Sequence, residues 1–512
     1  MEFVFESIPS LPRLGWCAEV DRGENFCRVT YGLGVETREN VFIEGAWNGP
    51  FKEFRFELAT TMIGTGGRVA PDGLVFSTST DMLTPVWTLE KADRLYLSNS
   101  LVFLLSRCDE YLDLNHPDYF WDLLQVKRWG LRKGQGDIRL ESKRRARIHF
   151  YCNLQVDRTL TIRRISKHFD RPPGTYREYR NLLSAGMRAV ILNAQDQERN
   201  FRYEPLATTS RGYDSVAISV LAAELGVRET LTFADDRRWQ DDGRAIAELL
   251  GMRVIEISKD QKQKIIDLAE AEICACPPGT GIGWAPATKH LEGRLLLGGY
   301  FGDRIIRLET QVNLPDLISP SSDGLPGQEF NEVRLRAGCL HFPVLFIAIN
   351  YSRSLFDISS AEEMQPFSVG GDYDRPILRR IVEEAGIPRT AFGQKKMVGP
   401  AVWISYPEIL SPAGRMDFEK FLGEKDLRAG GKPGIGDRLA AAIFLPLDRI
   451  NGFFKWLRRP GLTSLFLPLI LVSNRKRRHF WYPSIYRYTF HWGVDRLRRR
   501  YETESDRVAR HS

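Results

Sequence analysis

The chain has 512 residues, of which 43% are hydrophobic and 27% are charged. This composition is typical of folded soluble proteins and excludes a disordered chain, and the length predicts about two to four domains. The seven cysteines are irregularly spaced and odd in number, which excludes a disulfide framework and predicts a reducing, cytoplasmic setting. The first residues show no basic start followed by an apolar core, so no signal peptide is expected.

The net charge of +7 is concentrated at the C-terminal end. Residues 451–512 carry 14 Lys and Arg against 4 Asp and Glu, which leaves a net charge of −3 for the rest of the chain. Basic character therefore belongs to one tail and not to the whole surface, so nucleic acid is not an expected partner.

Residues 1–170 predict a mainly β domain. Alternating or aromatic-rich runs, separated by Gly, Asn and Pro, predict strands at residues 25–31, 52–58, 74–78 and 93–98. Residues 101–107 and 119–126 are short helix candidates. The next segment is predicted to be helical and linking, with an apolar period typical of a helix over residues 176–194.

Residues 203–225 predict a strand, a polar turn and a helix in that order. The turn contains Ser210, Arg211, Gly212, Tyr213, Asp214 and Ser215. A helix N-terminus presents unpaired N–H groups and the positive end of the helix dipole, so this turn is a candidate phosphate site. Gly212 permits a backbone conformation that a side chain would obstruct, the two serines supply hydroxyl donors, and Asp214 is a candidate magnesium ligand. The alternative is a capped helix with Asp214 or Ser215 as N-cap.

Strands and helices alternate after this turn. Strands are predicted at residues 229–233, 253–257 and 294–297, with helices at residues 241–250 and 261–270. This order predicts an α/β fold with a doubly wound parallel sheet, whose ligands bind at the carboxyl ends of the strands. Phe233, Gly298 and Gly299 lie at such ends and are therefore candidate ATP-binding residues.

The motif S-x-G-x-D-S resembles the pyrophosphate loop S-G-G-x-D-S of the ATP pyrophosphatases, which split ATP between its α and β phosphates. The resemblance implies an adenine nucleotide alpha hydrolase-like domain that uses ATP and Mg²⁺. Arg211 stands where that family usually has the first glycine of the pair. Its cation either contacts phosphate or crowds the loop, and both alternatives stay open.

A second motif, Gly299-Tyr300-Phe301-Gly302-Asp303, has the spacing of G-Y-G-S-D in the β-lactam synthetases and matches G-E-G-[S/A]-D-E of the asparagine synthetases. The resemblance implies that Asp303 joins Asp214 around magnesium. It also implies that Tyr300 relays a proton from an attacking amine. The alternative for Tyr300 is packing with a buried hydroxyl partner.

A third motif spans residues 367–397, where a polar loop leads into a helix that stops at Gly386. It resembles the asparagine-synthetase stretch in which a lysine stabilises the pentavalent phosphorus centre, and Arg375 takes the place of that lysine. Lys395 and Lys396 are further cationic candidates. For Arg379 and Arg380 the preferred interpretation is a solvated, basic helix end.

The N-terminal part resembles a diverged form of the N-terminal domain of glutamine-dependent asparagine synthetases, an Ntn-type glutaminase. The active family domain uses a cysteine directly after the initiator methionine, and here the second residue is Glu2. A carboxylate does not replace a thiolate as acyl acceptor, and Cys17 and Cys27 lack a free α-amine. The resemblance therefore implies a dead glutaminase. An unrelated β domain is the alternative.

The tail is predicted to be a basic helical extension. Its apolar run, residues 462–472, contains Pro468 and is about half the length that a bilayer requires. Aromatic and basic residues around this run make residues 453–482 a candidate for peripheral contact with a membrane surface or a partner protein. The alternative is a helical cap packed on the preceding domain. Residues 486–501 predict a final amphipathic helix.

The resemblance implies three parts: residues 1–170, a degenerate glutaminase-like domain; residues 171–430, an ATP-binding synthetase domain; and residues 431–512, the extension. It implies activation of a carboxylate as an acyl-adenylate with release of pyrophosphate, followed by attack of an amine or ammonia. Ammonia is either free or supplied by a separate amidotransferase. The competing class is a non-catalytic nucleotide-binding or scaffold protein. Cys274 and Cys276 form the only close cysteine pair, which alone is weak evidence for a metal site.

Overall fold

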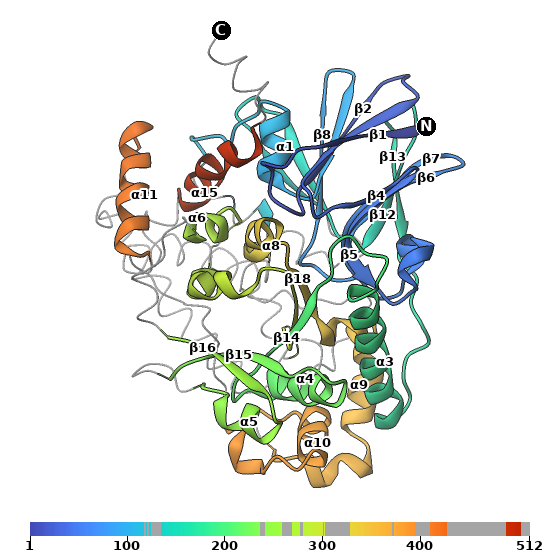
Figure 1. Ribbon diagram of the computed structural model, residues 1–512, viewed down its shortest axis with the longest axis vertical. Helices are drawn as coiled ribbons and strands as arrows, with labels where there is room; N and C mark the ends of the chain where they lie inside the picture. The colour runs from blue at the N-terminus through green and yellow to red at the C-terminus, as the bar shows by residue number, and fades with distance from the viewer. Residues whose placement is uncertain are drawn as a thin grey trace, which may run out of the picture.

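A computed structural model describes most of the chain. The described residues are 1–116, 119, 122–123, 135–235, 241–258, 269–276, 280–300, 302, 328–370, 373–394, 410–427 and 488–502. They form a mixed α/β structure, in which an N-terminal part with two β-sheets precedes a parallel sheet that is flanked by helices (Figure 1).

The N-terminal part consists of two sheets. The first has the strand order β1-β3-β2-β9-β8-β11-β10, and the second β13-β12-β7-β6-β5-β4. Neighbouring strands are antiparallel except for the parallel pair β1 and β3. The strands are β1 Glu2–Ser7, β2 Trp16–Asp21, β3 Phe26–Tyr31, β4 Glu36–Arg38, β5 Val41–Trp47, β6 Met62–Ala70, β7 Gly73–Ser77, β8 Val86–Lys91, β9 Arg94–Ser98, β10 Gln135–Arg139, β11 Arg145–His149, β12 Cys152–Val156 and β13 Ile162–Ser166.

Alternation along these strands buries one apolar face of each sheet against the other. Trp16 and Val29 of the first sheet pack in one cluster with Phe42 and Phe76 of the second. The Trp16 ring lies 5.0 Å from that of Phe42 and 6.1 Å from that of Phe76 between centroids. The two N-terminal sheets are therefore held together by an aromatic core.

Most of the N-terminal elements agree with the sequence prediction, and one does not. The predicted strands at 25–31, 74–78 and 93–98 and the helix at 101–107 are confirmed as β3, β7, β9 and α1 Leu101–Arg107. The predicted strand at 52–58 is wrong, because this segment forms two 3₁₀ turns, Phe51–Glu53 and Phe56–Leu58. Its aromatic side chains pack around Trp47 instead of alternating across a sheet. Most of the helix expected at 119–126 lies outside the described residues.

The five-stranded sheet has the order β16-β15-β14-β17-β18, and every neighbouring pair is parallel. Its strands are β14 Glu204–Thr208, β15 Glu229–Phe233, β16 Arg253–Ile257, β17 Arg294–Gly298 and β18 Leu340–Pro343. The chain proceeds outward from β14 to β16 and then returns to place β17 on the other side of β14. The order of the strands reverses at that point, which in open parallel sheets creates a crevice at the carboxyl ends of the two central strands.

Helices cover both faces of this sheet, as predicted. On one face Ala207 and Leu297 pack with α4 Tyr213–Glu224, α5 Arg244–Leu249 and α10 Pro376–Glu384. On the other face Leu206 and Leu296 pack with α6 Ala269–Cys274 and α8 Asn331–Ala337. In Figure 1 the first group lies below the sheet and the second above it.

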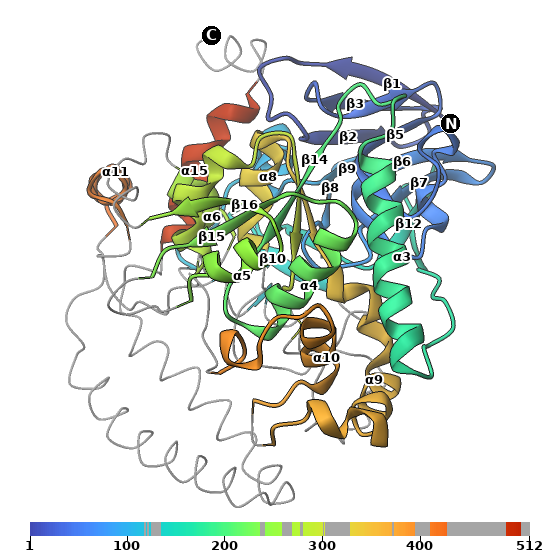
Figure 2. The same ribbon diagram turned by 60° about the horizontal axis from the view of Figure 1, so that its bottom comes forward.

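The remaining helices connect these parts. Helix α3 Tyr176–Ala194, confirmed at its predicted bounds, packs against β5 beside the N-terminal sheets (Figure 2). Helices α9 Ser352–Ser359 and α11 Pro412–Glu424 lie further along the chain. The predicted helix at 261–270 falls mainly outside the described residues, and α6 begins at Ala269.

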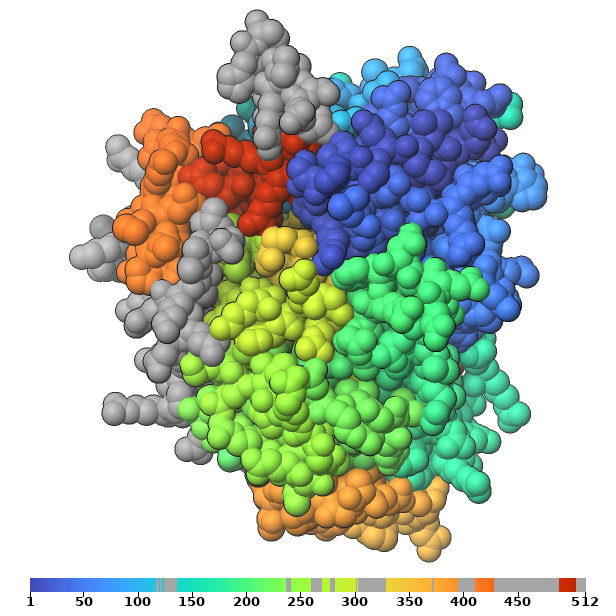
Figure 3. Space-filling view, viewed as in Figure 1, coloured from blue at the N-terminus to red at the C-terminus, as the bar shows by residue number. Residues whose placement is uncertain are grey.

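The last described helix, α15 Thr489–Arg498, confirms the amphipathic helix predicted near the C-terminus. Trp492 is fully buried, and its indole N–H donates to Asp417 of α11 at 2.7 Å. Helix α15 also packs against α6 and α1, and Figure 3 shows it between α11 and the N-terminal sheets. No helix among the described residues is long and apolar enough to cross a membrane, and residues 453–482 lie outside them.

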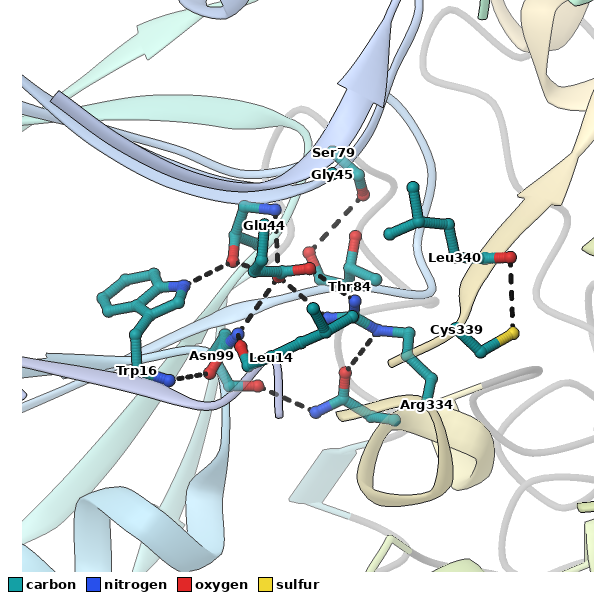
Figure 4. Close-up of polar contacts among 12 residues, drawn as sticks. Leu14, Trp16, Glu44, Gly45, Ser79, Thr84, Asn99, Arg334, Cys339 and Leu340 are labelled. Carbon is teal, nitrogen blue, oxygen red and sulfur yellow. Dashed lines mark hydrogen bonds and ion pairs between the residues drawn. The ribbon is translucent and has the colours of Figure 1, made fainter. Parts of the chain in front are cut away.

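A buried polar network joins the N-terminal sheets to α8 (Figure 4). Both guanidinium Nη atoms of Arg334 contact the carboxylate of Glu44 on β5, at 2.6 and 2.9 Å. Glu44 also accepts a hydrogen bond from Thr65 at 2.6 Å and one from Asn99 at 3.1 Å. Asn331 of α8 donates to the Asn99 carbonyl at 2.8 Å. The ion pair is therefore fully hydrogen-bonded, as a buried charge pair requires.

Candidate functional site

The two motifs of the sequence meet where the strand order reverses. Gly299, directly after β17, lies against the first turn of α4. A Cβ at Gly299 would lie 2.5 Å from the Asp214 carbonyl oxygen and 2.6 Å from the Ser215 nitrogen. A Cβ at Gly302 would lie 2.5 Å from Asp214 Cγ. A side chain at Gly299 would meet the backbone of α4, so glycine there permits the close approach of the two loops, and Gly302 lies against the Asp214 side chain.

The turn between β14 and α4 is stabilised by its own serines. The Ser210 and Ser215 hydroxyls are 2.8 Å apart, and Ser215 Oγ accepts the Ser210 N–H at 3.2 Å. The Gly212 N–H donates to Ser210 Oγ at 3.1 Å. The serine oxygens thus accept hydrogen bonds from the Ser210 and Gly212 N–H groups, which a bound phosphate would need as donors.

The alternative cap assignment is wrong in detail. The N-cap of α4 is Gly212, with no side-chain cap hydrogen bond, and not Asp214 or Ser215. The expected conformational need for glycine at 212 is also wrong. Its φ of −78° is open to any residue, and a Cβ there would have its nearest neighbour, Ser210 Oγ, at an ordinary 3.4 Å.

Arg211 lies along the connection between β15 and α5. Its Nη2 pairs with Asp235 at 3.2 Å, and its Nε donates to the Asp242 carbonyl at 3.1 Å. Its backbone N–H donates to Asp241 Oδ1 at 2.8 Å. Burial raises the pKa of Asp241, while the hydrogen bonds from Arg211 and the Ser210 hydroxyl oppose that shift. Because Asp241 and its neighbours make these contacts, α5 starts at Arg244 and not at the expected residue 241.

Tyr213 anchors the turn to α10. Its ring is buried, and its hydroxyl accepts a hydrogen bond from the guanidinium of Arg379. Its ring centroid lies 4.9 Å from that of Tyr373 and 5.8 Å from that of Phe392. Gly393 has a φ of 63°, and its N–H donates to the Arg211 carbonyl at 2.8 Å. The Tyr213 side chain therefore belongs to the core between α4 and α10.

The interpretation of Arg379 as a solvated helix end is wrong. Its side chain is 2% exposed and lies over the Tyr213 ring at 5.0 Å from the centroid, as well as pairing with Glu383 at 3.3 Å. The sequence pattern of α10 does not predict this burial, because an arginine in an amphipathic helix is expected on the polar, exposed face. Arg380, in contrast, pairs with the exposed carboxylates of Glu363 and Glu384 at 2.7 and 2.8 Å.

Arg375 stands at the N-terminus of α10 and is 6% exposed. Its Nη1 donates to the Asp374 carbonyl at 2.6 Å. Its Nε is buried and has no hydrogen-bond partner among the residues that the structure describes. A buried guanidinium with a donor to spare is costly without a ligand, so Arg375 retains its place as a candidate for binding an oxyanion.

Tyr179 of α3 is a residue that sequence reasoning missed. Its hydroxyl is fully buried and lacks a hydrogen-bond partner within the described part of the chain. Burial first, and then the charge of Asp214, raise the pKa of Tyr179, which places its hydroxyl within electrostatic reach of that carboxylate. The apolar period of α3 predicts that Tyr179 is a core residue. Its phenol hydroxyl was the one sign in the sequence that this core position also carries a polar group.

The far wall of the crevice includes His341 on β18. The Tyr300 and His341 rings are edge to face with centroids 6.1 Å apart. A Cβ at Gly298 would lie 3.5 Å from His341 Nε2 and 3.7 Å from Thr208 Oγ1, so those two polar groups flank the end of β17. Burial, and then the charge of Arg334, lower the pKa of His341 from 6.5 to about 4, so the imidazole is neutral at pH 7.

The remaining predicted site residues either pack against other side chains or lie outside the described part of the chain. Phe233 ends β15, where its ring meets that of Trp284 at 5.0 Å between centroids. Asp303 and Lys395 lie outside the described residues, as does Lys396. Within the described part of the chain, no group of three or more His, Cys, Asp or Glu side chains is arranged to hold a metal ion.

The cysteines are poor nucleophiles where they are described. Cys17 and Cys27 lie buried in the first sheet, and burial raises the pKa of both thiols. Burial also raises the pKa of the Cys274 and Cys276 thiols well above the ordinary value. Glu2 is exposed at the start of β1.

Comparison with known proteins gives no further guide: no protein-family model matches the chain, and the search of curated proteins found no match.

Proposed function

We propose that this protein is an ATP-dependent ligase of the asparagine-synthetase type. It activates a carboxylate as an acyl-adenylate, releases pyrophosphate and forms an amide. The observation that carries the proposal is the close contact between Gly299, the first residue of the G-Y-x-x-D motif, and the first turn of α4, which holds Asp214 of the S-x-G-x-D-S motif. The finer fold assignment, a PP-loop domain after an Ntn-like domain, belongs to this proposal.

The residues around the crevice fit the oxyanion of a nucleotide. The N-terminus of α4 supplies the positive end of a helix dipole, and Asp214 in its first turn is the described carboxylate that would hold magnesium. Magnesium would offset the charge of the departing pyrophosphate. The buried Nε of Arg375, with no partner among the described groups, is a donor suited to a phosphate oxygen. Asp303 and Lys395 complete the proposed set from the sequence alone.

The second half-reaction needs a proton acceptor. The attacking amine forms a bond to the acyl carbon, AMP leaves with the bonding electron pair, and one proton must leave the nitrogen. Tyr300 is proposed to relay that proton, and its ring lies edge to face with that of His341. Aspartate and ammonia are not the proposed substrate pair, since the asparagine-forming relatives have glutamate where Tyr300 stands.

The proposed nitrogen source is free ammonia, a primary amine or a separate amidotransferase. The described cysteines of the N-terminal sheets are buried with raised thiol pKa values, so none of them is an activated nucleophile for glutamine. Purified protein should therefore release no glutamate from glutamine. Measurable glutamate release would contradict this part of the proposal.

The direct test is release of pyrophosphate from Mg-ATP in the presence of a panel of carboxylic acids. The ligase is expected to release pyrophosphate with at least one of them and to require both Mg²⁺ and the acid. Asp214→Asn should abolish that release. A protein that binds ATP but releases no pyrophosphate with any acid would contradict the ligase assignment.

A second function, a non-catalytic nucleotide-binding or scaffold protein, is favoured by one specific observation. The backbone donors of the turn are occupied internally, by Ser215 at residue 210, by Asp241 at residue 211 and by Ser210 at residue 212. Nucleotide binding without turnover, unaffected by the carboxylic acids of the panel, would support that alternative.

A further inference from the structure

The anion position of the β14–α4 turn is taken by a carboxylate of the chain itself. Asp241 Oδ1 accepts the backbone N–H of Arg211 at 2.8 Å. The other occupied donors of the turn face neutral serine oxygens, which rotate away at little cost. Asp241 is different because it presents a negative charge to the donors that a phosphate would use.

We infer that Asp241 is an internal competitor for phosphate: it occupies the anion position of the turn, and an incoming pyrophosphate group must displace it. This inference rests on the proposed function, because it concerns regulation of the same site. Two anions cannot share the Arg211 N–H, so binding of nucleotide is coupled to release of the Asp241 side chain from the turn.

The Arg211 side chain holds the residues next to Asp241 in place. Its Nη2 pairs with Asp235 at 3.2 Å and its Nε donates to the Asp242 carbonyl at 3.1 Å, on either side of Asp241 along the connection. The Asp242 N–H in turn donates to Asp235 at 2.7 Å. A glycine at position 211 would lack these side-chain bonds. Arg211 is therefore a tether that keeps Asp241 on the turn.

Two unsatisfied side chains near the turn indicate that the site is built for a ligand and not only for Asp241. The Arg375 Nε is buried and without a partner among the described groups, on a side chain that lies 5.9 Å from the Tyr373 ring centroid. The Tyr373 ring lies tilted against that of Tyr213 in the first turn of α4, with centroids 4.9 Å apart. The Tyr179 hydroxyl, also buried without a described partner, lies within the field of Asp214. Asp241 satisfies neither of these donors.

The test measures binding of inorganic pyrophosphate and of Mg-ATP to the full chain by calorimetry. Asp241→Asn removes the competing charge and should bind both ligands about tenfold more tightly than the parent, because a charge-assisted bond no longer has to be broken. Arg211→Ala should change affinity in the same direction. The matched control is Asp242→Asn. In the parent the Asp242 carboxylate accepts the Arg244 N–H at 2.8 Å, at the first residue of α5. This variant should bind like the parent.

Hydrogen exchange at the Arg211 amide supplies a readout that needs no nucleotide. It should be faster in Asp241→Asn than in the parent and unchanged in Asp242→Asn. Should Asp241→Asn fail to fold, Arg211→Ala carries the same comparison. Equal or weaker ligand binding by Asp241→Asn, with binding by the parent, would overturn this inference alone. Failure of every variant to bind either ligand would overturn the proposed function together with it.

Discussion

Glu44 and Arg334 form an ion pair in the interior, with side chains 0% and 2% exposed and two contacts of 2.6 and 2.9 Å. One residue lies on a strand of the second N-terminal sheet and the other on α8, beside the parallel sheet. The pair therefore fixes the position of one part of the protein relative to the other. Breaking such a pair leaves an uncompensated buried charge, which costs far more than the net contribution of the intact pair.

Replacing Glu44 by Gln keeps the shape of the side chain and removes its charge. We expect the free energy of unfolding to fall by about 3–5 kcal/mol, measured by chemical denaturation. The control is Arg353→Gln, which breaks the exposed pair with Asp357 and should change stability by less than about 0.5 kcal/mol. A loss below about 1 kcal/mol for Glu44→Gln would show that this pair does not hold the two parts together.

Asp81, near Arg334, makes the stability of the protein depend on pH. Burial raises the pKa of Asp81 from 3.8 to about 6, against opposing hydrogen bonds from Ser79 and the Leu83 N–H. The folded state therefore binds this proton more tightly than the unfolded state. The resulting stability is fully present below about pH 4 and is lost as pH rises through about 6, by up to about 3 kcal/mol.

Asp81→Asn mimics the protonated side chain and should remove that loss. Its free energy of unfolding, relative to the parent, should rise between about pH 4 and pH 6 and then level off, as measured in urea denaturation series. Asp72→Asn, at an exposed turn, serves as the control and should follow the parent at every pH. A constant difference between Asp81→Asn and the parent across this range would contradict the raised pKa.

Asp214 is expected to govern binding of Mg-ATP. Asp214→Asn should weaken that binding at least about tenfold, since a charged ligand of the metal becomes a neutral one, and the melting temperature should hardly change. Glu224→Gln, at the opposite end of the same helix and in an exposed pair with Arg180, should bind like the parent. Unchanged affinity of Asp214→Asn would remove the carboxylate from the proposed site.

Tyr300→Phe separates the two half-reactions. Only amide formation needs a proton to leave the amine, so this variant should slow amide formation about a hundredfold or more and leave adenylate formation nearly unchanged. Pyrophosphate exchange and product formation, measured side by side, give the two rates. An equal loss in both, or in neither, would make Tyr300 a packing residue. Efficient conversion of aspartate and ammonia to asparagine would contradict the proposed substrate class.

The sequence predicts the parallel sheet well because β14 to β17 are apolar runs separated by helices with a clear period. It does not predict β18, a strand of four residues that ends in Pro343, and it therefore misses His341. The strand expected at residues 52–58 fails for a related reason. Its aromatic residues satisfy a strand pattern, but local 3₁₀ turns bury the same side chains around Trp47.

In the candidate site, too, the sequence predicts the backbone positions better than the side-chain contacts. Asp214 and Gly299 each follow a central strand of one parallel sheet, so the strand–helix order was enough to expect them at the same end of that sheet. The contacts of Arg211, Asp241 and Arg379 were not predictable, since each depends on a segment brought close only by the folded chain. Spacing within a motif predicts where a backbone turns, whereas the partner of a long charged side chain is set by tertiary packing.

The most direct test of the ligase assignment is ATP–pyrophosphate exchange by the parent protein in the presence of carboxylic acids and Mg²⁺. We predict exchange that requires one of these acids, disappears in Asp214→Asn and persists in Tyr300→Phe. Absence of exchange with every acid, from a folded protein that binds Mg-ATP, would contradict adenylate formation and leave nucleotide binding without catalysis as the function of this crevice.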